Sequence, residues 1–219
     1  KFLNASNLFP NLREVGSGVN GDGLFIVGFT PANISGFNAL FNVSGDLAVQ
    51  NTIYLVTLNG FNALTKVKPL SSNNQAMLYF SNNRALTNIN GFGILNEISW
   101  DYFFINNPSL VALPNTHLLT IIGKTLTINK CHSLVNFNGI NNLTTIINGN
   151  LNISQNDNLS SLDGLDSLSI CYGIGISSCP SLVDITALSS LTTFNEVSNR
   201  AIVNISDNNS LSSLTGLDN

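Results

Sequence analysis

A leucine returns at nearly regular intervals along most of the chain, and this repeat constrains the fold more than any other feature. Laid on itself at a spacing of about 24 residues, the sequence divides into units that each carry the leucine at the same station. The members of this leucine column are Leu12, Leu40, Leu64, Leu95, Leu119, Leu143, Leu168 and Leu191. Such a repeat predicts a solenoid, because one unit cannot bury its apolar side chains until neighbouring units stack on it.

Two further apolar columns accompany the leucines. Three residues after each leucine comes a column made of Val15, Val43, Val67, Ile98, Ile122, Ile146, Cys171 and Phe194. The fourth position of the units supplies another, made of Ile34, Leu58, Ile89, Leu113, Phe137, Leu162, Ile185 and Leu214. We expect all three columns to face a common interior.

The units have the pattern of strands rather than helices. Segments such as "LTIN", "LNIS" and "AIVNIS" alternate at period two and are rich in β-branched residues, whereas no unit holds about ten residues of uninterrupted helical periodicity. The sequence therefore predicts an all-β fold, a right-handed parallel β-helix of about eight coils with three short parallel sheets. We expect residues 1–219 to form this single domain, a rod about 40 Å long.

A polar column lies three residues before the units and consists of Asn83, Asn107, Asn156 and Asn208. We predict that these side chains point inward at one corner and bond the backbone groups that the turn leaves free. Cys131 and Cys179 take the same station in two units, and Cys171 stands in the Val/Ile column. Cys131 and Cys179 lie two coils apart, about 9–10 Å, too far for a disulfide, so all three cysteines are expected to be small buried residues.

The composition excludes several classes of partner. Charged residues make up 9% of the chain and the net charge is −4, and no run of Lys or Arg exists that could neutralise a row of phosphates. Nucleic acid is therefore not an expected partner. No stretch approaches the roughly 18 apolar residues of a membrane span, and nothing at Lys1 has the pattern of a signal peptide. The expected partners are other protein chains, copies of this chain included, or glycans.

Units such as "LVNFNGINNLTTIINGNLNISQNDN" and "LSSLDGLDSLSICYGIGISSCPS" resemble the receptor L-domain, a leucine-rich β-helical module of receptor ectodomains and microbial surface proteins. The resemblance runs from about Leu3 to Asn219 and carries no active-site motif. It implies an extracellular or cell-surface module, often glycosylated and not enzymatic, that serves in ligand binding, adhesion or wall architecture.

The run "SWDYFFINN" is the densest aromatic stretch of the sequence. Matching Phe103 and Ile105 to the inward Leu151 and Ile153 predicts that the alternate residues of this run face outward. Such aromatic groups could stack on a sugar ring or a protein partner, or could pack beneath the loop at residues 68–76. The resulting candidate partner-binding residues are Trp100, Tyr102, Phe104 and, on the preceding coil, Tyr79.

Several asparagines precede X-Ser/Thr and are candidate glycosylation sites. The residues expected to point outward are Asn42, Asn142 and Asn152. The other candidates are Asn4, Asn33, Asn158 and Asn204. Asn208 also lies in such a triplet, but its place in the inward column predicts poor access.

Catalysis and ice binding are the alternative functions for a β-helix. A polysaccharide-acting enzyme would gather carboxylates on one face, yet the acidic residues fall at different stations, namely Asp157, Asp163, Asp166, Asp184 and Asp207. We predict no catalytic residue, no cofactor and no metal. Ice binding would need a flat threonine row, and Thr120, Thr144, Thr145, Thr192 and Thr193 form one that Lys66, Glu97 and Arg13 interrupt.

Three longer units gain their extra residues just after the Val/Ile column, at residues 16–23, 68–76 and 195–200. We expect these insertions along one edge of the rod, where they serve as binding loops or are merely tolerated. Both end coils are expected to expose strand edges. The chain is then a piece of a longer solenoid, or copies stack end to end into a filament or surface layer.

Overall fold

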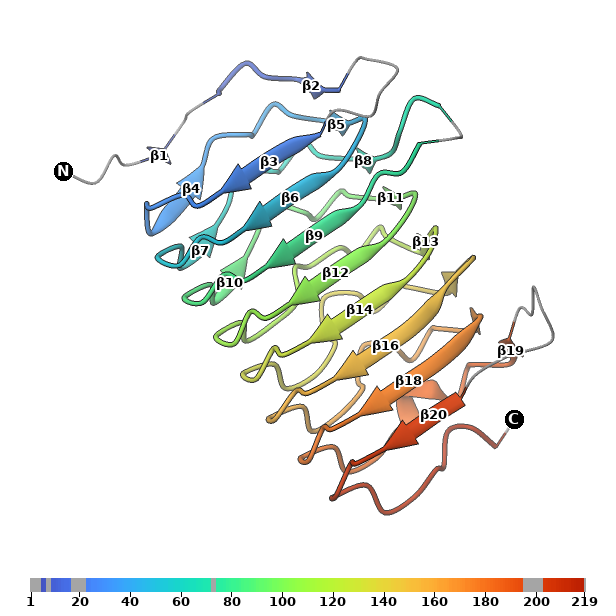
Figure 1. Ribbon diagram of the computed structural model, residues 1–219. Helices are drawn as coiled ribbons and strands as arrows, with labels where there is room; N and C mark the ends of the chain where they lie inside the picture. Colours follow the sequence, from blue (N-terminus) through green and yellow to red (C-terminus); the bar gives the residue numbers. More distant parts are fainter. Residues whose placement is uncertain (1–4, 7–8, 17–22, 72–73, 195–202, 219) are drawn as a thin grey trace.

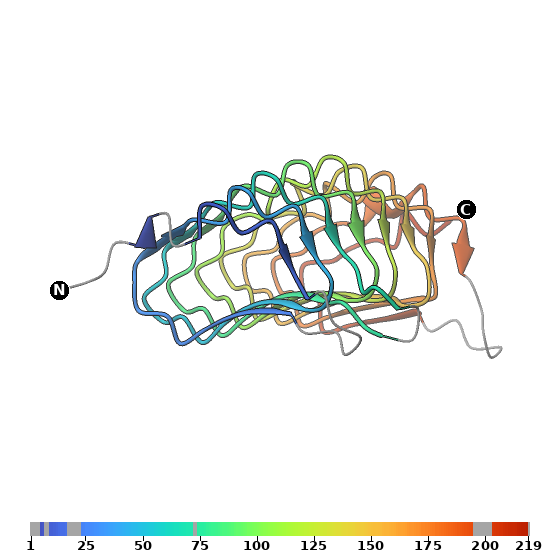
Figure 2. The same ribbon diagram turned by 90° about the horizontal axis from the view of Figure 1, so that it is seen from above.

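The structure is a computed structural model that describes residues 5–6, 9–16, 23–71, 74–194 and 203–218. The prediction of an all-β solenoid with three parallel sheets is confirmed. In Figure 1 the chain winds in the right-handed sense from the N-terminal coil at the top to the C-terminal coil at the bottom. Figure 2, a view from above, shows that successive coils follow the same outline.

Three sheets run along the stack, here called A, B and C. Sheet A has four strands, β1 (Ala5–Ser6), β4 (Asn33–Ser35), β7 (Thr57–Leu58) and β10 (Asn88–Ile89). Sheet B has eight, β2 (Glu14–Val15), β5 (Asn42–Val43), β8 (Lys66–Val67), β11 (Glu97–Ile98), β13 (Ile121–Ile122), β15 (Thr145–Ile146), β17 (Ile170–Cys171) and β19 (Thr193–Phe194). A single short 3-10 helix among the described residues, η1, spans Thr186–Leu188.

Sheet C contains the longest strands and faces the viewer in Figure 1. Its eight strands are β3 (Leu24–Val27), β6 (Leu47–Gln50), β9 (Leu78–Ser81), β12 (Tyr102–Ile105), β14 (Leu126–Asn129), β16 (Asn150–Ser154), β18 (Gly173–Ser177) and β20 (Val203–Ser206). Every pairing between neighbours is parallel and in register. Equivalent residues of successive coils therefore form straight rows along the sheet.

The interior consists of the predicted columns. The leucines from Leu40 to Leu191 are buried, as are the Val/Ile column from Val43 to Cys171 and the third column from Ile34 to Ile185. Leu12, Val15 and Phe194 are only partly buried, at the two ends. The expectation for Leu214 is wrong: its side chain is 57% exposed, because it lies in the last described coil and no further described coil packs on it.

The asparagine column makes the predicted corner, with the same two contacts in each coil that has an asparagine there. The Asn156 Oδ1 atom accepts a hydrogen bond from the Cys131 N–H at 2.8 Å, and its Nδ2 atom donates to the Ile128 carbonyl at 3.0 Å. Asn83, Asn107 and Asn208 likewise each donate to a strand carbonyl of the preceding coil, at 2.8–2.9 Å. Each amide thus satisfies two backbone groups that would otherwise be buried without partners.

The residue before this corner has a left-handed backbone in every coil. Its φ angle is 55–56° at Asn51, Asn82, Asn106, Lys130, Gln155, Ser178 and Asp207, and 62° at Gly28. Left-handed geometry costs a non-glycine residue roughly 1–2 kcal/mol, so the corner holds only because the coils above and below fix it. This repeated turn ends each strand of sheet C and keeps the strands in register.

An aromatic stack, which the sequence analysis missed, fills the N-terminal half of the interior. The rings of Phe37, Phe61 and Phe92 stack with centroids 5.0 Å apart. Phe92 meets Phe80 edge to face at 6.0 Å, and Phe80 stacks on Phe104 at 5.2 Å. Phe80 and Phe104 belong to β9 and β12, so these rings pack directly behind the part of sheet C where the candidate site lies.

Candidate functional site

The candidate site is the outward face of sheet C, because no described segment crosses it in Figure 1. The strands alternate, so one row of side chains along the centre of the sheet points away from the interior. In chain order this central row is Phe25, Ala48, Tyr79, Phe103, Thr127, Asn152, Gly175 and Asn204. The first four residues are apolar or aromatic and the last four are small or polar, so the face has two distinct halves.

The structure corrects the predicted orientation of the aromatic run. Tyr102 and Phe104 are fully buried, so neither can contact a partner. Tyr102 pairs in register with Leu78 and Leu126, which places Phe103 outward instead. Matching Phe103 to Leu151 placed this strand one residue out of register. A shift of one residue turns every side chain of a strand to the opposite face.

We call Phe25, Ala48, Tyr79 and Phe103 the aromatic patch. The Phe25 side chain is 51% exposed, whereas Tyr79 and Phe103 are half-buried. Ala48 pairs with Phe25 and Tyr79 in the outward row, yet its side chain is fully buried, so the groups around it cover it. The exposed apolar surface of the patch is therefore made by the side chains of Phe25, Tyr79 and Phe103.

Polar groups border the aromatic patch on both sides. Gln50 lies two residues after Ala48, and Ser81 lies two residues after Tyr79. Both are half-buried and form part of the next outward row. On the other side lie two carboxylates: Asp46 Oδ1 accepts a hydrogen bond from Met77 N–H at 2.9 Å, and Asp101 Oδ1 accepts one from Thr125 N–H at 2.8 Å.

Burial and nearby charges shift the pKa of two groups at the patch, Asp101 and Tyr79. Burial raises the pKa of Asp101, while the Thr125 hydrogen bond and the Lys124 charge act in the opposite direction. Burial also raises the pKa of Tyr79, with a further contribution from the negative charge of Asp46. The phenol of Tyr79 is therefore neutral and able to donate a hydrogen bond.

Trp100, a predicted contact residue, lies outside the strands of sheet C. The Lys124 Nζ atom stands 4.3 Å from the centroid of its half-buried ring, a cation–π contact between neighbouring coils. The alternative that Trp100 packs beneath the loop at 68–76 depends partly on residues 72–73, which lie outside the described residues. Most of the insertion at 16–23 and all of the insertion at 195–200 also lie outside them.

Charged side chains gather on sheet B and are absent from sheet C. Glu97 on β11 contacts Lys68 at 2.7 Å and Lys66 at 3.8 Å, and all three side chains are substantially exposed. None of the eight described strands of sheet C contains Asp, Glu, Lys, Arg or His. The candidate site is therefore a neutral surface on one side of a sparsely charged molecule.

Two of the acidic residues considered for catalysis, Asp166 and Asp184, accept hydrogen bonds within local turns. Asp184 Oδ1 accepts from the Thr186 N–H at 3.0 Å, and Asp166 Oδ2 accepts from the Gly164 N–H at 2.9 Å. Asp157 lies 3.0 Å from the His132 Nδ1 atom on the exposed surface. Within the described ranges, no three His, Cys, Asp or Glu side chains come close enough together to hold a metal ion.

The cysteines and the threonine row are also structural. Cys131, Cys171 and Cys179 are buried and free, and burial raises the pKa of Cys131 and of Cys171 to about 12. Such thiols stay protonated and are poor nucleophiles. The Thr144 Oγ1 atom donates to the Thr120 carbonyl at 3.1 Å, so this hydroxyl is engaged within the chain rather than offered to ice.

The candidate glycosylation sites differ in how freely their amides are presented. Asn33, Asn158 and Asn204 are exposed, while Asn152 is half-buried in the central row. Asn42 Nδ2 donates to Ser44 Oγ at 2.9 Å, and Asn142 Nδ2 donates to the His117 carbonyl at 2.7 Å. Asn4 lies outside the described residues.

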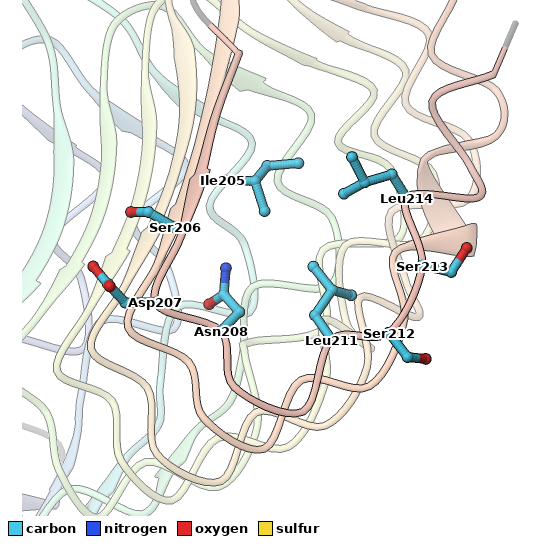
Figure 3. A pocket seen from close by; sticks show the side chains of 8 residues that line it. All are labelled: Ile205, Ser206, Asp207, Asn208, Leu211, Ser212, Ser213 and Leu214. Carbon is cyan, nitrogen blue, oxygen red and sulfur yellow. The ribbon is translucent and has the colours of Figure 1, made fainter.

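A hollow lies at the C-terminal face of the last described coil (Figure 3). Ile205, Leu211 and Leu214 line it together with Asn208 and four further polar residues. In the preceding coils the equivalent apolar side chains are covered by the next coil. This hollow is thus the open end of the interior column, and it lacks the converging polar groups of a ligand site.

The described part of the chain contains no helix with the length and apolar character that crossing a membrane requires. Comparison with family models, with curated proteins and with solved structures finds no match. The function of the site must therefore follow from its own residues.

Proposed function

We propose that the chain is a non-catalytic recognition or adhesion solenoid of receptor L-domain type, acting outside the cell or at its surface. The observation that carries this proposal is the aromatic patch, in which Phe25, Tyr79 and Phe103 stand on a parallel sheet that no described segment covers. Large exposed apolar patches rimmed by polar groups mark interaction sites in soluble proteins.

The chemistry elsewhere on the described surface favours binding over turnover. Carboxylates are committed to turns, as at Asp166 and Asp184, and the buried thiols are protonated. Rigid interior packing behind sheet C holds the patch in one shape, which lowers the entropy lost on binding. We place recognition before end-to-end assembly because the patch lies on a sheet face that no described segment crosses, whereas the lining of the end hollow continues the interior column of the preceding coils.

An array of purified surface proteins and of glycans, probed with the labelled protein, tests the proposal. We expect at least one component to retain the protein, and the double variant Tyr79→Ser/Phe103→Ser to lose that binding at least tenfold. Val111→Ser is the matched control, because Val111 is 49% exposed but lies outside sheet C.

Tyr79 and Phe103 are half-buried, so the double variant should lose some stability, and binding is compared at a temperature where thermal unfolding shows that both proteins are folded. Retention of no component, or equal retention of the double variant and the parent chain, would overturn the proposed role of the patch.

A further inference from the structure

Resting on the proposed function, we infer that the aromatic patch binds an extended, uncharged, β-1,4-linked glycan lying along the axis of the rod. The ligand would stack its sugar rings on Phe25 and Tyr79 and reach Phe103 with the next ring. Three observations lead to this ligand: the neutrality of the sheet, the spacing of the strands that carry the rings, and the polar groups beside the rings.

Neutrality selects the class of ligand. The strands of sheet C carry no ionisable side chain except the neutral phenols of Tyr79 and the buried Tyr102. The nearest charges on the patch border are the carboxylates Asp46 and Asp101. The Lys124 ammonium near Asp101 already stands over the Trp100 ring, and the two carboxylates would repel a phosphate polymer or a sulfated glycan. A neutral polymer rich in hydroxyl groups would not be repelled.

The spacing of the strands that carry the rings selects the linkage. Phe25 and Tyr79 belong to β3 and β9, which β6 separates, so their rows lie two strands apart. Two strand spacings are roughly 10 Å, which is also about the length of a β-1,4-linked disaccharide. Successive sugars of such a chain are turned over, so each presents the same face to the sheet once per disaccharide. Ala48 on the intervening strand is fully buried, so it adds no side chain that would stand between the ligand and the two rings.

The polar borders lie where the hydroxyl groups of a bound chain would point. Gln50 and Ser81 follow the aromatic row on one side, and the carboxylate of Asp46 flanks it on the other, close enough to raise the pKa of Tyr79. Sugar binding commonly combines an aromatic face with such donors and acceptors, because the ring is apolar on its faces and polar at its edge.

Sedimentation with insoluble polymers tests this inference, using chitin and cellulose as the β-1,4-linked probes. Starch and a β-1,3-glucan serve as polymers of similar chemistry but different shape. We expect retention on chitin or cellulose, little on the other two, and at least a tenfold loss of affinity for Phe25→Ser/Tyr79→Ser. Val111→Ser should bind like the parent chain.

Soluble oligosaccharides give a second measure. Phe25 and Phe103 lie three strands apart, roughly 14 Å, so affinity measured by calorimetry should rise with chain length and level off near four sugars. Absence of binding to both β-1,4 polymers would overturn the inference, as would equal binding by Phe25→Ser/Tyr79→Ser.

The two proposals fail in different ways. A patch-dependent protein ligand on the array, together with no binding to either polymer, would leave the recognition role standing and remove the glycan. A patch-dependent dimer without glycan binding would assign the face to a second copy, again against the glycan.

Discussion

Asp101 shows at the scale of one residue how the border of the patch affects stability. Its carboxyl is almost fully buried, and burial raises its pKa above the ordinary value. The folded protein therefore holds this proton more tightly than the unfolded chain does. By linkage, the free energy of unfolding contributed by this group falls as the pH rises through the ordinary Asp pKa toward the folded one, and stays lower at neutral pH.

We predict that Asp101→Asn raises the free energy of unfolding at pH 7, because an amide oxygen still accepts from the Thr125 N–H while the charge is gone. Near pH 3, where most Asp carboxyls are protonated (about 3.9 is usual), the difference should vanish. Urea unfolding at several pH values measures it. Asp184→Asn is the control with the opposite sign, because its hydrogen bonds to Thr186 lower its pKa. No gain for Asp101→Asn at neutral pH would contradict the prediction.

At the scale of one structural element, the asparagine corner is imperfect where cysteine replaces asparagine. The Cys131 Sγ atom lies 3.8 Å from the Phe104 carbonyl, a weak contact where the neighbouring coils have an amide donor. The carbonyls that Asn107 and Asn156 serve are held at 2.8 and 3.0 Å.

We predict that Cys131→Asn raises the free energy of unfolding by about 1 kcal/mol, because an amide can satisfy the Phe104 carbonyl and the N–H of the preceding coil. Cys171→Asn is the matched control: Cys171 stands in the apolar column, so an amide there is expected to be destabilising. Urea unfolding with an unchanged m-value measures both. A loss of stability for Cys131→Asn would show that the corner is not interchangeable between coils.

The same corner explains what the sequence could predict and what it could not. The interior columns follow from their repeat alone, because a column is recognised whichever residue starts the count. Which residues of a strand face outward depends on the residue from which the alternation is counted. Counting back from the asparagine corner gives the correct assignment, because Tyr102 lies five residues before Asn107, as the inward Leu151 lies five before Asn156. Counting from the unit start instead reversed Tyr102 and Phe104.

The Phe37–Phe61–Phe92 stack had a signal too, since Gly-Phe recurs at Gly36, Gly60 and Gly91. Gly60 and Gly91 have positive φ and approach the preceding coil so closely that a Cβ atom would lie within 3.0 Å of its backbone. The aromatic patch itself had no repeat to reveal it, because its members share a face but not a residue type.

At the scale of the whole molecule, each coil contacts mainly the coils before and after it, so a defect is expected to stay local. We predict that Leu143→Ala lowers the free energy of unfolding by about 2–5 kcal/mol, because it leaves a cavity in the middle of the interior. Hydrogen exchange should rise most in β13, β15, β14 and β16, and least in β3 and β6. Thr144→Ala, one residue later and facing outward, should cost under about 1 kcal/mol. Uniformly faster exchange would show that the rod unfolds as one unit.

The separation of charge between sheets B and C has a consequence for the medium in which the molecule can work. Dissolved ions screen electrostatic forces beyond about 10 Å at 0.1 M ionic strength. Salt therefore weakens binding that depends on contacts between exposed charges. Binding made mainly by aromatic faces and uncharged donors, with an uncharged ligand, depends little on forces that dissolved ions screen. The affinity of binding through sheet C should therefore change little between low and high salt concentration, whereas contacts made through Lys66, Lys68 and Glu97 should weaken as the salt concentration rises.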